Sequence, residues 1–180
     1  MAFIDWSRAL EGAQVACQNA RRLADDALRL HDMQSFLTAF SISILAWEET
    51  NKAGLLLKNY IEKRDISKAE WFDKFSNHKK KLEAYPEYYS ILYPNSSPPG
   101  QTAANTKMTE IGRTLDLEKQ HFGFYTDFVE RSSRWFSPTT LSTQTIEYAT
   151  WLGKHYATQS ILTCLEIEEH IKQLQQAKTP

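Results

Sequence analysis

The sequence has little of what marks several common classes of protein. Two cysteines, Cys17 and Cys164, lie far apart in 180 residues and do not form a disulfide framework. There is no Gly-rich phosphate loop and no Gly-x-Ser-x-Gly nucleophile elbow. No apolar run is long enough to span a membrane, and residues 1–5 do not resemble a signal peptide. We therefore expect a cytoplasmic protein with no membrane partner.

An excess of charge of one sign is also absent. The 21 Lys and Arg residues are offset by 22 Asp and Glu residues, which gives a net charge of −1. No global basic field would attract a nucleic acid, so a polyanion could be held only by a local patch. Hydrophobic residues at 42% and charged residues at 24% are ordinary for a globular protein, and the length predicts one domain over residues 1–180.

Alternating strand patterns are lacking, whereas apolar residues recur at steps of three and four. The pattern predicts an all-α, up-and-down bundle of about five helices. A polar connection at 63–67 should separate the second and third helices, Pro86 should end or kink the third, and 86–105 should be a long loop. The expected helices run from Trp6 to Leu30, from there to about Glu62, from Trp71 to Tyr85, from Met108 to Val129, and from Ser142 or Thr143 towards the C-terminus.

The second predicted helix carries a polar cluster within an apolar face. Reading Ala39 to Tyr60 at helical steps gives one core-facing line in which Glu49 is the only carboxylate. Glu48 is spaced to pair with Lys52 at i,i+4, and Glu49 is spaced to pair with Lys52 at i,i+3. A buried carboxylate is costly unless it is paired, so the cluster is either a structural ion pair or part of a site.

His78 occupies a core-facing position on the third helix, between Phe75 and Leu82. His78 and Lys52 are equally distant from the middle of the short connection at 63–67. Because a short connection favours antiparallel neighbours, we expect His78 to lie level with the Glu48, Glu49 and Lys52 cluster.

Basic and aromatic side chains are mixed on the same predicted helix. Such a mixture can follow a phosphate backbone and stack bases, although a solvated lysine face with buried aromatics explains it equally well. The five histidines show no ligand spacing, so we expect neither a metal nor a cofactor. The mixed cluster comprises Lys74, Lys79, Lys80, Lys81, Trp71, Phe72 and Tyr85.

Together the motifs resemble the AbiV-type abortive infection proteins, a branch of the HEPN helical-bundle superfamily. The resemblance is carried by Ala46-Trp-Glu-Glu-Thr-Asn-Lys-Ala53, Phe75-Ser-Asn-His-Lys-Lys-Lys81, Gly123-Phe-Tyr-Thr-Asp127 and Trp135-Phe-Ser-Pro138. It implies a HEPN-like bundle that pairs as a homodimer and defends a cell against phage.

The chain departs from the family pattern in two places. Asn51 stands where the family commonly has Gly. The Arg-x(4–6)-His motif of the superfamily's ribonucleases is absent, and the segment with Lys119 and Tyr125 is its candidate counterpart. Whether the protein is an enzyme is therefore left open.

The resemblance implies two alternative functions. The first is metal-independent RNA cleavage or RNA binding that shuts down translation in infected cells. The second is a non-enzymatic dimeric regulator that senses a phage protein or binds the translation machinery, and a phage-encoded activator is a candidate partner in either case. In the first alternative, the catalytic residues would be Glu49, Lys52, His78 and Lys81, and RNA would contact Lys79, Lys80, Lys119, Tyr125 and Asp127.

Overall fold

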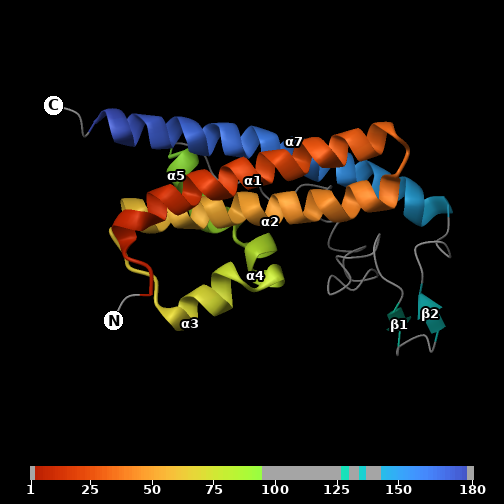
Figure 1. The fold of residues 1–180 in the computed structure, drawn as a ribbon, viewed down its shortest axis with the longest axis horizontal. Helices are drawn as coiled ribbons and strands as arrows, with labels where there is room; N and C mark the ends of the chain where they lie inside the picture. The colour runs from red at the N-terminus through yellow and green to blue at the C-terminus, as the bar shows by residue number, and fades with distance from the viewer. Residues whose placement is uncertain (1–2, 95–126, 130–133, 137–142, 178–180) are drawn as a thin grey trace.

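Three long helices form the body of the protein, as predicted for an all-α bundle (Figure 1). The structure is a computed structural model that describes residues 3–94, 127–129, 134–136 and 143–177. Helix α1 spans Trp6–Asp32, α2 spans Phe36–Ile61 and α7 spans Thr143–Gln176. Helices α2 and α7 run parallel to each other and antiparallel to α1 (Figure 1).

The face of α1 that lies against the bundle is built almost entirely from alanine. Short side chains allow neighbouring helices to approach closely. Asp5 caps the helix by accepting a hydrogen bond from the amide of Ser7 at 2.8 Å. The buried alanines are Ala9, Ala13, Ala16, Ala20, Ala24 and Ala27.

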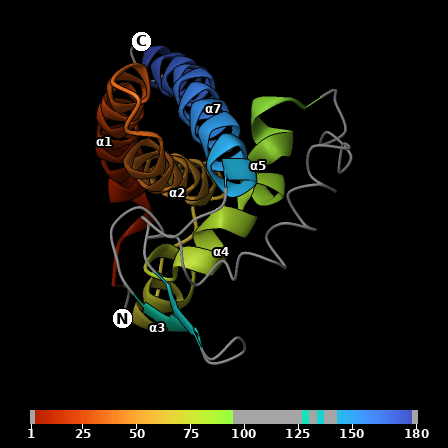
Figure 2. The same cartoon turned by 90° about the vertical axis from the view of Figure 1, so that its right-hand side faces the viewer.

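Helix α2 is the centre of the fold. It packs against α1, α7, α4 and α5, so that most of its surface is covered by described elements (Figure 2). Its buried residues therefore lie all around the helix, and they include Glu48, Thr50, Asn51 and Asn59. Glu49 and Lys52, on one side of the helix, stay partly exposed to water.

The predicted third helix is divided into several short ones. Ser67 caps α3, Lys68–Glu70, as the sequence indicates. A π-helical turn, η1, covers Trp71–Phe75. The side chain of Asn77 then accepts from the amide of Lys80 at 3.3 Å and begins a new helix, α4, over His78–Glu83.

Helix α4 ends at Glu83 and α5 spans Tyr85–Leu92, so the prediction that the preceding helix ends or kinks at Pro86 is confirmed. Pro86 lies in the first turn of α5, where its missing N–H costs no hydrogen bond and its fixed φ suits a helix. The predicted loop at 86–105 is thus helical as far as Leu92, and its residues from 95 onward lie outside the described part.

A short strand stands where the predicted fourth helix ends, and a second strand follows it. Strand β1, Asp127–Val129, pairs antiparallel with β2, Arg134–Phe136, and Asp127 is opposite Phe136. Residues 108–126 of the predicted helix lie outside the described residues. The periodicity did not indicate this hairpin, because strands of three residues are too short to show alternation.

Gly54 makes possible the close packing of α5 on α2. A Cβ atom at Gly54 would lie 2.4 Å from Cε2 of Tyr88, whose ring is fully buried and has no room to move away. At Gly12, by contrast, a Cβ atom would meet only a terminal methyl carbon of Leu56, at 3.2 Å.

Replacing Gly54 with alanine should destabilise the protein, by about 1–3 kcal/mol, because the added methyl group overpacks against Tyr88. The matched change Gly12→Ala should be neutral or stabilising, because alanine favours a helix more than glycine does. Denaturant unfolding followed by circular dichroism measures both. Equal effects of the two changes would contradict this account of α5 packing.

Candidate functional site

Four consecutive polar residues of α2 reach four different neighbouring helices. Successive residues of a helix point about 100° apart, so Glu48, Glu49, Thr50 and Asn51 together cover the whole circumference. Glu48 meets α4, Glu49 meets α1, Thr50 meets α7 and Asn51 meets α5. The polar motif is therefore four separate contacts around one helix.

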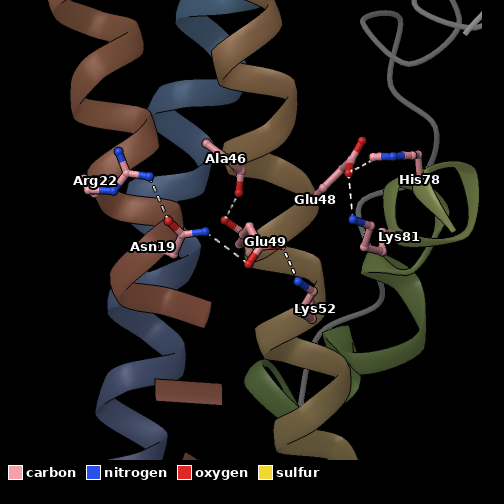
Figure 3. Close-up of polar contacts among 9 residues, drawn as sticks. Asn19, Arg22, Ala46, Glu48, Glu49, Lys52, His78 and Lys81 are labelled. Atoms are coloured by element: carbon pink, nitrogen blue, oxygen red, sulfur yellow. Dashed lines mark hydrogen bonds and ion pairs between the residues drawn. The ribbon is translucent and has the colours of Figure 1, made fainter. Parts of the chain in front are cut away.

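Glu48 and its two partners on α4 form the part of the polar motif that is best suited to catalysis. Its Oε2 lies 2.6 Å from Nδ1 of His78 and 2.8 Å from Nζ of Lys81 (Figure 3). The side chains of Glu48 and Lys81 are 1% and 7% exposed, whereas that of His78 is 52% exposed. A buried carboxylate thus anchors an imidazole that reaches the surface.

Helix α4 presents both partners of Glu48. His78 and Lys81 are three residues apart, at the start of the helix, and so share one face. The cap at Asn77 sets where this helix begins. The prediction that His78 lies near the polar cluster is confirmed at Glu48, but the prediction that His78 faces the core is wrong, because the predicted third helix is broken just before it.

Glu49 points to a different side of α2, and its predicted pairing with Lys52 is confirmed. Its Oε2 accepts from Nδ2 of Asn19 at 3.3 Å, and its Oε1 pairs with Nζ of Lys52 (Figure 3). The carboxylate buried in the core is Glu48, whereas Glu49 is 18% exposed, and Glu48 pairs with Lys81 instead of Lys52. The periodicity of α2 does not reveal that α4 covers the Glu48 side.

Thr50 lies at a junction between α1, α2 and α7. Its hydroxyl is 3.6 Å from Sγ of Cys164 and donates to the carbonyl of Ala46 at 2.9 Å. The thiol of Cys17 is beside Cys164, and its hydrogen bond to Cys164, together with burial, raises the pKa of Cys17. The two cysteines, distant in sequence, therefore meet in the core.

Asn51, which stands where Gly was expected from the resemblance, makes a buried hydrogen bond to α5. Its Oδ1 accepts a 2.6 Å hydrogen bond from the hydroxyl of Tyr88, and both side chains are buried. Burial raises the pKa of Tyr88 well above its ordinary value, so the phenol stays protonated and remains a donor. Nothing in the local sequence of α2 identifies this partner, because it comes from α5.

The residues predicted to contact RNA lie in different parts of the chain, and two of them are outside the described residues. Lys80 is exposed on α4, and Lys79 is on the same helix. Asp127 lies in β1, while Lys119 and Tyr125 are outside the described residues. Across the described ranges, no three metal-ligating side chains come together.

Two of the three aromatic side chains in the predicted basic cluster are used for packing. Trp71 stacks on Phe75 with ring centroids 5.2 Å apart, and Tyr85 packs against Trp47 at 5.4 Å. Phe72 is exposed. Of the three, only Phe72 presents a largely solvent-exposed ring.

A family model described as AbiV, of the HEPN type, matches residues 8–151. The chain belongs to the HEPN AbiV family. The match covers most of α1, all of α2 and the Glu48, His78 and Lys81 group, so the resemblance in the motifs is confirmed. Membership connects this AbiV protein with abortive infection.

Comparison with curated proteins and with solved structures gives no match for the AbiV chain. No helix within the described ranges is both long and apolar enough to cross a bilayer.

Replacing Glu48 with alanine should cost roughly 3–5 kcal/mol of unfolding free energy, because Lys81 would become a buried charge without its carboxylate. Replacing Glu49 with alanine should cost no more than about 1 kcal/mol, because Glu49 and Lys52 are both partly exposed to water. Urea unfolding of the two variants compares adjacent glutamates in one helix. A larger loss for Glu49→Ala would reverse the assignment of the buried pair.

Proposed function

We propose that this AbiV protein acts on RNA during abortive infection, with His78 as the general acid and base. The observation that supports the proposal is the half-exposed imidazole of His78, which a buried carboxylate holds in place. General acid–base catalysis needs a titratable group that is both fixed and within reach of a substrate. His78 meets both conditions.

The proposed reaction is metal-independent cleavage of a phosphodiester. His78 takes the proton from a ribose 2′-hydroxyl, whose oxygen forms a bond to the adjacent phosphorus. The bond from phosphorus to the 5′-oxygen breaks and leaves a 2′,3′-cyclic phosphate. The protonated His78 gives the proton it has taken to the departing 5′-oxygen, which returns the imidazole to its neutral form.

Positive charge on the same helix supports RNA as the substrate. Lys80 is exposed on α4, two residues after His78, and can contact phosphate. Lys81 neutralises Glu48, so the buried carboxylate does not leave an unbalanced negative charge beneath the phosphate. Glu49 and Lys52 support the site indirectly, by fixing α2 against α1 through Asn19.

The second candidate function is a dimeric regulator without catalysis. The near-complete burial of Glu48 and Lys81 favours it, because buried ion pairs can serve to fix one arrangement of helices. In that case His78 contributes to docking of α4, and loss of protection should follow loss of stability.

The change His78→Gln should abolish phage protection and RNA cleavage without unfolding the protein. The glutamine amide can still donate a hydrogen bond to Glu48, but it cannot act as an acid or a base. The measurements are plaque counts in cells and incubation of the purified protein with total and transfer RNA, with and without chelator. His170→Gln is the matched control, since His170 is a partly exposed histidine on α7 that makes no contact with Glu48. Full activity of His78→Gln would exclude catalysis by His78.

We also propose that the protein is a homodimer. Large apolar side chains remain exposed on two adjacent long helices, at Val15 on α1 and at Leu162 and Leu165 on α7. Exposed apolar groups of this kind are typical of surfaces that meet a second chain.

Light scattering at micromolar concentration should therefore give twice the chain mass of 20.8 kDa. The double change Leu162→Asp and Leu165→Asp should lower the measured mass if α7 contributes to the interface, because paired carboxylates would have to be desolvated there. A monomeric mass for the unmodified protein would contradict the proposal.

A further inference from the structure

We propose that Glu48 is a positioning residue that holds His78 in the tautomer with its proton on Nδ1. Nε2 is then the nitrogen that gives and takes protons. The catalytic consequence depends on the proposed action on RNA, whereas the assignment of the tautomer does not.

The contact itself determines the position of the proton. Oε2 of Glu48 lies 2.6 Å from Nδ1 of His78, and an ionised carboxylate only accepts hydrogen bonds. Nζ of Lys81, which can only donate, lies 2.8 Å from the same oxygen. With this contact, a neutral His78 carries its proton on Nδ1, and Nε2 is the unprotonated ring nitrogen.

The surroundings of Glu48 make it a rigid support. The side chain is 1% exposed and belongs to α2, the helix that the rest of the bundle surrounds. Its partners come from a different helix, and one of them, Lys81, is nearly as buried. A carboxylate held between two elements orients the ring more firmly than one on a loop would.

Proton transfer gives this arrangement a catalytic use. When Nε2 takes a proton, the ring becomes a cation whose Nδ1–H still points at the carboxylate of Glu48. The carboxylate stabilises that cation and keeps the ring orientation, as the buried carboxylate does in a catalytic triad. Lys81 moderates this effect, because it shares the same carboxylate oxygen.

Glu49 provides a matched comparison within the same helix. It is the next residue of α2 and has the same side chain, yet its carboxylate contacts Asn19 and Lys52 (Figure 3). If the general negative charge of this region determined the tautomer of His78, replacing either glutamate would change it. If the direct contact determines the tautomer, only replacement of Glu48 will change it.

Long-range ¹H–¹⁵N NMR of histidine rings tests the tautomer directly. At mildly alkaline pH, where imidazoles are neutral, the His78 signals, assigned by their loss in His78→Gln, should show a protonated Nδ1 and an unprotonated Nε2. The reverse pattern in the unmodified protein would overturn the proposal, and this reading does not require any variant of Glu48 to fold.

The double change Glu48→Leu and Lys81→Met tests the cause. It replaces the buried ion pair with apolar groups, which buried sites often tolerate, and circular dichroism checks that the protein stays folded. We expect His78 to change to the tautomer protonated on Nε2, which is preferred by free histidine. Lysine cannot accept a hydrogen bond, so the loss of Lys81 does not itself remove an acceptor from Nδ1. Glu49→Gln should leave the tautomer unchanged, and a folded double variant that keeps the proton on Nδ1 would also overturn the proposal.

RNA cleavage by the same proteins gives the catalytic readout. The double variant should lower kcat more than it raises KM, because the tautomer affects proton transfer in preference to RNA binding. If no protein in the series cleaves RNA but the tautomers are as expected, the proposed reaction fails while the positioning role of Glu48 stands. Unchanged kcat in a folded double variant with the altered tautomer would overturn the catalytic part of the inference.

Discussion

The structure depends on the near-complete enclosure of α2. A helix surrounded by other elements has to pair most of its polar side chains within the protein, because little water reaches them. This constraint explains why a motif of consecutive polar residues can occur in the core. Each of these side chains meets a different neighbour, and together they fix the directions from which α1, α4, α5 and α7 approach.

The long helices could be predicted from the sequence because their periodicity extends over many turns. The starts at Trp6 and Thr143 and the end near Ile61 agree with the pattern of apolar residues. Shorter features could not be found in this way. The π-helical turn η1, the cap at Asn77 and the strands β1 and β2 depend on local hydrogen bonds over a few residues, where periodicity carries little information.

The candidate site, too, could be predicted only in part from the sequence. The sequence indicated that a carboxylate of α2 would meet His78, because the two lie at similar distances from a short turn. It favoured Glu49 over Glu48, because the apolar residues of α2 indicate one buried face, and Glu49 is on that face. Adjacent residues differ in direction by about 100°, so choosing between them requires knowing every neighbour of the helix. Tyr88 and Cys164 were missed as polar partners for the same reason, because each comes from a helix distant in sequence.

The shortness of α4 has a consequence for when the site exists at all. Six residues are too few for a helix to be stable alone in water, so α4 is ordered by its docking on α2. Leu82 supplies apolar contact with the cluster around Phe40 and Ile44, and Glu48 supplies the charged contact. The helix can therefore open locally while α1, α2 and α7 stay folded, and each such opening separates His78 from its carboxylate. Assembly of the site and folding of α4 are one equilibrium, and any partner that holds α4 down would increase the fraction of molecules in which the site is formed.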